Sequence, residues 1–261
     1  MYTAPRDSRT ILTMQVDVTS YPDATQKVVN WAREGRSRIV CAANVHMVME
    51  THDDPSFGSI VNGADLVTPD GVPLVWALRL MGVEEATRVY GPDLTLHVCE
   101  AAALQRIPIG LYGGTPESLD DFETFLTQRF AGTHIGCKIA PPFRPPTPEE
   151  DARYIQEINT SGVRILFVGI GCPKQEKWMA EHKNTVHAVM LGVGAAFDFH
   201  TGRVRQAPGL IQRLGLEWAF RLAMEPGRLW KRYLKHNPRF VVLFLRQLLG
   251  QRAKKGINTK R

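Results

Sequence analysis

Short apolar segments alternate with helical patterns along most of this chain of 261 residues. Helices are expected between the apolar segments, for example at residues 72–82, 115–130 and 147–162. The apolar segments, expected to contain the strands, cover residues 38–46, 65–71, 108–114, 135–143, 165–171 and 187–199. Regular strand–helix alternation is typical of α/β folds with parallel strands. We therefore predict a doubly wound, mainly parallel, Rossmann-like sheet.

Charge divides the chain into two parts. Residues 201–261 hold 15 lysines and arginines but only two acids, Glu217 and Glu225, for a net charge of +13. The preceding 200 residues hold 17 lysines and arginines against 24 acids, for a net charge of −7. We predict an α/β domain over residues 1–202 and a basic helical appendage over residues 203–261.

The appendage interleaves basic and apolar side chains. Its longest apolar run, residues 240–245, is far shorter than the roughly 20 residues that span a membrane. This pattern favours a helix lying on an anionic membrane surface. A nucleic-acid patch and a solvated basic end are the alternatives, and we predict the membrane surface and no nucleic acid as the partner.

Motif searches narrow the chemistry and the compartment. The four cysteines form no CxxC pair, and the N-terminal residues are polar, which together favour a reducing, cytoplasmic setting. The sequence has no HExxH, DxD or GxSxG motif, so we expect neither a metal, nor a cofactor, nor a serine nucleophile.

Polar and glycine residues follow the predicted strands. In doubly wound sheets, ligands bind beyond the carboxyl ends of the strands. We expect one cleft at this sheet edge, formed by five loops that carry Asn44, Asp70 with Gly71, Gly113 with Gly114, Gly169 with Gly171, and residues 192–198.

The turn after residues 165–168 is a candidate phosphate site. Gly169 and Gly171 permit a sharp turn and a close approach of the backbone to a ligand. The following helix carries Lys174 and Gln175, and free N–H groups at a helix start favour an anion such as a nucleotide diphosphate. Neither GxGxxG nor GxxxxGK[ST] is present, so an ordinary turn that binds nothing is the alternative.

Asp70 and Arg88 are the strongest single candidates. A carboxylate at the end of a buried strand is placed to act as a general base, although Pro-Asp-Gly is also a common turn sequence. The guanidinium of Arg88 suits phosphate, although a lone arginine is more often at the surface.

Three further polar residues have two interpretations each. Gln175 either holds a sugar hydroxyl or lies on a solvated helix face. Asn44 either binds sugar or caps the following helix, and capping is favoured. Asp198 either binds a ribose or sugar hydroxyl or caps the turn at Thr201 and Gly202.

Taken together, the motifs resemble the WecG/TagA/CpsF family of bacterial glycosyltransferases. They are AANVHMV, ADLVTPDGVPLVWA, RVYGPDL, LYGGTPE, PPF, GIGCPKQEKW, GVGAAFDFHTGRVRQAP and GLEWAFRLAMEPGR, in that order over residues 11–236. The resemblance implies inverting, metal-independent transfer of a sugar from a UDP-sugar to a polyprenyl-diphosphate-linked glycan. This step builds precursors of exopolysaccharide, capsule or teichoic acid at the inner face of the cytoplasmic membrane, where the enzyme would be peripheral.

The resemblance also implies roles for individual residues. Asp70 would be the general base, Arg88 would stabilise the departing diphosphate, and Gln175 would contact the donor sugar or its phosphate. Arg221 and Arg228 look like arginines of the family's appendage that complete the active site. The predicted substrate- and nucleotide-binding set is Asn44, Gly113, Gly114, Gly169, Gly171, Lys174, Gly192, Gly194, Asp198, Arg221 and Arg228.

Two departures from the family pattern leave the donor open. Ala42 stands where some members have threonine, and His46 stands where glutamate is frequent. Glucose, N-acetylmannosamine and its uronic acid are all retained as donors. The acceptor, the linkage and the oligomeric state, a homo-oligomer included, are open as well. The alternatives to an enzyme are a UDP-sugar-binding regulator without turnover, in which Asp70 is structural, and a nucleic-acid-binding module.

Overall fold

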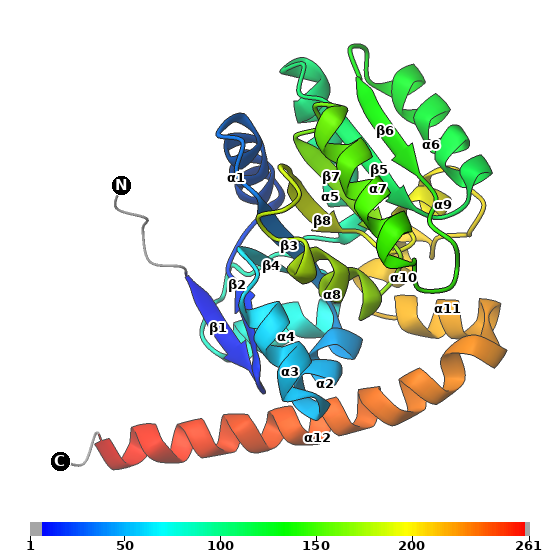
Figure 1. Cartoon of the computed structure of the whole chain (residues 1–261). Coiled ribbons are helices and arrows are strands. Elements are labelled where there is room, and N and C mark those ends of the chain that lie inside the picture. The colour runs from blue at the N-terminus through cyan, green and yellow to red at the C-terminus, as the bar shows by residue number, and fades with distance from the viewer. Residues whose placement is uncertain (1–6, 259–261) are drawn as a thin grey trace.

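The core of the computed structural model, which describes residues 7–258, is a parallel sheet of six strands in the order β4-β3-β8-β7-β5-β6 (Figure 1). The strands are β3 (Arg38–Ala43), β4 (Leu66–Pro69), β5 (Ile109–Gly113), β6 (Ile135–Ile139), β7 (Ile165–Gly169) and β8 (Val189–Gly192). All five pairings within this sheet are parallel. The predicted Rossmann-like, doubly wound α/β fold is therefore confirmed.

Helices cover both faces of the sheet, because successive side chains of a strand point to opposite sides. In β7, for example, Ile165 and Phe167 pack into one hydrophobic cluster, and Leu166 and Val168 pack into the other. One face carries α1 (Tyr21–Arg33), α5 (Gly91–Leu104), α6 (Pro116–Arg129) and α9 (Ala196–His200). The other carries α2 (Val45–Asp53), α3 (Pro55–Asn62), α4 (Val72–Leu80), α7 (Pro148–Thr160) and α8 (Lys174–Glu181).

Local sequence sets where several helices begin. The Asn44 side chain accepts a hydrogen bond from the Met47 N–H and caps α2, as favoured from the sequence. Thr115 caps α6 in the same way, and Thr147 with Glu150 forms a capping box at α7. These caps fix the points at which the chain leaves the sheet edge.

Several elements have no counterpart in the sequence interpretation, among them α1, α3 and the strands β1 (Ser8–Ile11) and β2 (Met14–Asp17). β1 and β2 form a separate antiparallel hairpin, with Leu12 in a left-handed conformation at its turn. Asp54 ends α2, and its side chain caps α3 directly afterwards.

The basic end of the chain folds into α10 (Gly209–Arg213), α11 (Glu217–Met224) and α12 (Pro226–Asn258). Figure 1 shows α12 as a long helix that runs past α2 toward the β1–β2 hairpin. Phe240 and Phe244 are buried on its inner face, and Gln247 accepts a hydrogen bond from the Leu12 N–H. In the part of the chain that is described, no helix is both long and apolar enough to cross a membrane.

The predicted boundary at residue 202 lies between α9 and α10, and it stays a prediction. Beyond this point α12 packs closely on α2, so the predicted appendage and the predicted α/β domain are in contact. The first six residues of the predicted α/β domain and the last three of the predicted appendage lie outside the described residues.

Candidate functional site

A cavity of about 780 Å³ opens at the carboxyl ends of four strands, β3, β4, β7 and β8. Helices α11 and α12 supply its other wall, so the appendage and the sheet edge enclose it together. The cavity brings together nine predicted site residues: Asn44, Asp70, Arg88, Gly171, Gln175, Gly192, Gly194, Arg221 and Arg228.

The remaining predicted residues lie outside this lining, so only four of the five expected loops meet in the cavity. Gly113 has a φ of 127° and faces its sheet partner so closely that a Cβ would lie 2.5 Å from the carbonyl oxygen of Gly169. These two glycines, with Gly114, therefore serve strand and turn packing. Nucleotide contact at these three glycines stays a prediction.

Lys174 and Asp198 also lie away from the cavity lining. The side chain of Lys174 is exposed. The Asp198 carboxylate accepts a hydrogen bond of 2.6 Å from Ser118 and so ties α9 to α6. The turn after α9 uses the backbone carbonyl of Asp198, which accepts from the Val204 N–H and from the Thr201 hydroxyl, while the Asp198 carboxylate is engaged by Ser118.

Asp70 directly follows β4, and its N–H donates to the carbonyl of Ala43 on β3. Only 14% of its side chain is exposed. Burial raises the pKa of Asp70 to about 7, and the nearby carboxylate of Glu217 adds to this effect. The positive charges of Arg88 and Arg221 oppose it. A carboxylate with this pKa can accept a proton near neutral pH.

Arg88 connects the sheet edge to the appendage. Its Nε donates to the Asp70 carbonyl, and its Nη2 lies 3.6 Å from the Asp70 carboxylate and 2.6 Å from that of Glu217. The guanidinium stacks on Tyr90, 4.1 Å from the ring centroid, and Tyr90 itself donates to Glu217. With 20% of its side chain exposed, Arg88 lies in the cavity wall and is not an isolated surface arginine.

Gln175 is buried, so the alternative of a solvated helix position is wrong. Its Oε1 accepts from the N–H groups of Gly171 and Gly194, at 3.2 and 3.1 Å, and thereby joins the loops after β7 and β8. Its Nε2 donates to Glu176. Gly192 leaves room for it, since a Cβ there would lie 2.8 Å from Nε2. The Gly171 N–H, expected to be free for an anion, is therefore engaged by Gln175.

The appendage contributes residues that the sequence interpretation did not assign to the site, Glu217 and Arg232. Arg221 lies over Phe199, and both Arg221 and Arg232 line the cavity with a buried Nε that has no hydrogen-bond partner. Glu217 had one available signal in the sequence: it is one of two acids in an otherwise strongly basic segment. Arg228 also lines the cavity, but its side chain is exposed and pairs with Glu225.

A comparison with protein families agrees with this geometry. The model of the "Glycosyl transferase WecG/TagA/CpsF family" matches residues 9–254. The match covers the six-stranded sheet, every residue that lines the cavity, and most of α12.

Proposed function

The chain belongs to the WecG/TagA/CpsF family of glycosyltransferases, which act in cell-surface polysaccharide synthesis. From this premise we propose that it moves a sugar from a UDP-sugar to a polyprenyl-diphosphate-linked glycan acceptor, with inversion at the anomeric carbon. The observation that carries the proposal is the Asp70 carboxylate, which lines the cavity with a pKa of about 7, beside Arg88 and Arg221.

Asp70 is the general base of this mechanism. It removes the proton from the acceptor hydroxyl while the oxygen attacks the anomeric carbon of the donor. The new glycosidic bond forms as the bond between the anomeric carbon and the UDP oxygen breaks, so the proton ends on Asp70 and the negative charge on UDP. A base whose pKa lies near the working pH is ionised and still basic enough for this transfer.

Cationic side chains in the cavity stabilise the leaving diphosphate. Arg88 and Arg221 both act on the Asp70 carboxylate electrostatically, and Arg221 Nε has no partner within the protein. A guanidinium can bind two phosphate oxygens at once. As the bond to UDP breaks, charge grows on the diphosphate, and fixed arginines stabilise that charge without rearranging.

Gln175 holds two loops of the cavity wall in place. By accepting the Gly171 and Gly194 N–H groups it fixes both loops relative to each other. Direct contact of Gln175 with the donor sugar, and of Asn44, Gly192 and Arg228 with the substrates, stay predictions. The donor stays open among glucose, N-acetylmannosamine and its uronic acid.

The position of the cavity suits an acceptor held in a membrane. Apolar side chains that are both exposed and at the cavity wall come from α4 and from the appendage, for example Trp76, Leu80 and Trp218. Exposed Trp230 and Leu234 lie among the basic residues of α12. We propose that this side of the protein binds the anionic inner face of the cytoplasmic membrane, so that the lipid-linked sugar enters the cavity from there.

A UDP-release assay tests the proposal. The full chain is given each candidate UDP-sugar and a short polyprenyl-diphosphate-linked acceptor, with and without EDTA. Acceptor-dependent release that persists in EDTA, and that Asp70→Asn abolishes while UDP still binds, is the expected result. If UDP binds but every donor is inert, the protein is a UDP-sugar-binding regulator and the transferase proposal is wrong.

A further inference from the structure

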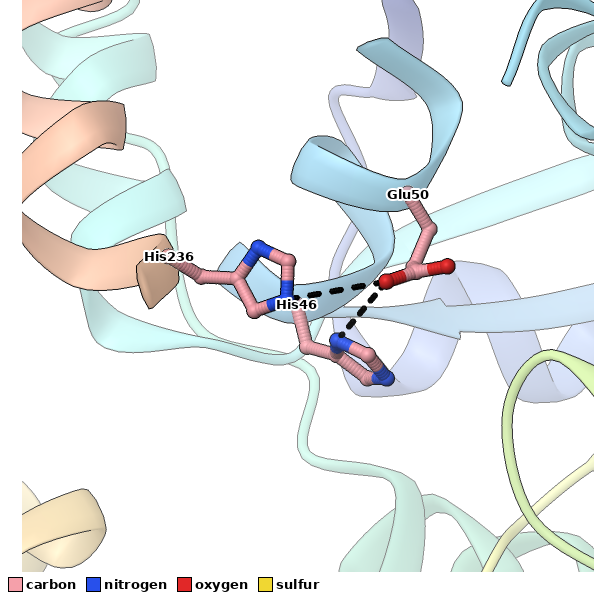
Figure 2. A group of neighbouring side chains, drawn as sticks. All are labelled: His46, Glu50 and His236. Atoms are coloured by element: carbon pink, nitrogen blue, oxygen red, sulfur yellow. Dashed lines mark ion pairs between the residues drawn. The ribbon is translucent and has the colours of Figure 1, made fainter. Parts of the chain in front are cut away.

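Three polar side chains converge where α12 crosses α2. His46 and Glu50 lie one turn apart on α2, and His236 projects toward them from α12 (Figure 2). His46 Nδ1 lies 3.7 Å and His236 Nε2 lies 3.6 Å from the same oxygen, Oε1 of Glu50. Both imidazoles are largely buried, with 16% and 5% of the side chain exposed.

These distances are too long for the hydrogen bonds that normally satisfy buried polar groups, which are about 2.7–3.2 Å. His46 Nδ1 has no hydrogen-bond partner at all. The spacing instead fits an ion between the groups. Zinc bonds of about 2.0–2.1 Å at tetrahedral angles place neighbouring ligand atoms about 3.3 Å apart. The three donor atoms lie within 4.8 Å of one another, so binding of an ion requires them to move closer together.

The surroundings of the cluster favour a metal in two ways. His46 Nδ1, the ring nitrogen that lies 3.7 Å from Glu50 Oε1, is buried and has no hydrogen-bond partner, so it is free to bind an ion. In addition, the nearby cations Lys235 and Arg239 form their ion pairs with Asp53, at 3.6 and 2.7 Å, and not with Glu50.

We propose that His46, Glu50 and His236 form a Zn²⁺ site that fastens the appendage to the α/β domain. Two imidazole nitrogens and one carboxylate suit Zn²⁺, whereas Mg²⁺ and Ca²⁺ prefer oxygen ligands alone. The fourth position is open to water from the cavity, which His46 and His236 also line. In this proposal the ion links α2 to α12, and its binding does not depend on the function proposed above.

The sequence could not reveal this site. His46 and Glu50 share one helix face, but the third ligand lies 190 positions further along the chain, and only the packing of α12 on α2 brings it near. His46 is also one of the two positions at which the chain departs from the pattern that its motifs resemble.

Titration of the full chain with Zn²⁺, after removal of metals with a chelator, tests the proposal. Calorimetry should give one ion per chain, and Co²⁺ in place of Zn²⁺ should give the visible absorption of a tetrahedral site. His236→Gln and Glu50→Gln should each weaken binding by at least about tenfold, since even outer-shell changes cost that much. His134→Gln, an exposed histidine before β6, is the matched control and should bind as the unaltered chain does.

A second measurement guards against variants that merely misfold. Zn²⁺ should raise the Tm of the unaltered chain and of His134→Gln, and at the same Zn²⁺ concentration it should raise the Tm of Glu50→Gln by less. The Glu50 side chain makes no hydrogen bond within α2, so Glu50→Gln should fold as the unaltered chain does. Its circular dichroism spectrum should therefore match that of the unaltered chain. Failure to bind Zn²⁺ or Co²⁺, or equal affinity in the two ligand variants and the control, would overturn the proposal.

Discussion

Glu217 of the appendage accepts a 2.6 Å ion-pair contact from Arg88 of the α/β domain, while Arg88 also faces the carboxylate of Asp70. One arginine thus lies between two carboxylates, one from each part of the chain. Because Glu217 raises the pKa of Asp70, docking of the appendage changes the acidity of the proposed base. The acid–base chemistry of the sheet edge therefore depends on a residue of α11.

Glu217→Gln tests this link. Removing the negative charge lowers the pKa of Asp70, so the acidic limb of the pH profile of kcat/KM should move to lower pH. Glu225→Gln is the control, because the other acid of the appendage pairs with Arg228. A profile that stays in place in Glu217→Gln would show that the two carboxylates do not interact.

Asp70 itself should set the pH dependence of transfer. With a pKa of about 7, the base is protonated in acid and ionised above neutrality, so kcat/KM should rise through about pH 7 and then level off. Asp70→Asn should reduce kcat by at least about 100-fold, the lower range for loss of a general base. An activity that is constant from pH 5 to 8 would exclude this role.

The raised pKa of Asp70 also predicts how the stability of the protein depends on pH. The pKa of Asp70 is raised in the folded state above its usual value of 3.8, so its contribution to stability is present in acid and is lost as pH rises toward 7. Asparagine does not titrate. The Tm of Asp70→Asn minus that of the unaltered chain should therefore be larger at pH 8 than at pH 5. Differential scanning calorimetry at both values measures it, and an equal difference would contradict the raised pKa.

Gln175→Ala should destabilise the loops after β7 and β8. The substitution leaves the N–H groups of Gly171 and Gly194 without their acceptor, and an unsatisfied buried donor costs about 1–3 kcal/mol. Urea unfolding measures the change. Lys174→Ala, at the exposed neighbouring position, should change the free energy of unfolding by less than about 0.5 kcal/mol. Equal losses in the two variants would remove the structural role given to Gln175.

Membrane binding should depend on the apolar residues of α12. Trp230 and Leu234 are 48% and 68% exposed, and replacing both with serine should weaken binding to vesicles of anionic lipid by at least about tenfold. Leu104→Ser is the control, since Leu104 is 79% exposed at the end of α5, away from the cavity lining. Tighter binding to duplex DNA than to vesicles at physiological salt would favour the nucleic-acid alternative instead.

The sequence predicted the cavity-lining residues best where they lie at or directly after the end of a strand. Asn44, Asp70 and Gly192 could be placed because parallel strands carry their carboxyl ends to one edge, and a short loop leaves little freedom. Gly113 shows the limit of that argument: it also follows a strand, but its missing side chain serves the close approach of β5 to β7. A glycine that makes room for a ligand and one that makes room for backbone look identical in a sequence.

Glu217, Arg232 and His236 of the appendage could not be placed from the sequence, for a different reason. Helical periodicity gives the faces of α11 and α12, but it does not give the direction in which either helix crosses the domain. Glu217, Arg232 and His236 reach the cavity only because residues such as Phe240 and Phe244 pack α12 onto α2. These contacts are tertiary, and neither residue spacing nor local propensity encodes them.

The strand order has a consequence for how the protein is made. β8 (Val189–Gly192) is the last strand in the sequence, yet it lies between β3 and β7 near the middle of the sheet. Until β8 has emerged from the ribosome, β3 with β4 and β5 with β6 and β7 are two separate parts of the sheet. Each part then exposes an unpaired strand edge, and such edges are where nascent chains aggregate. The final strand therefore closes the sheet and completes the floor of the cavity in one event, just before the appendage emerges to cover it.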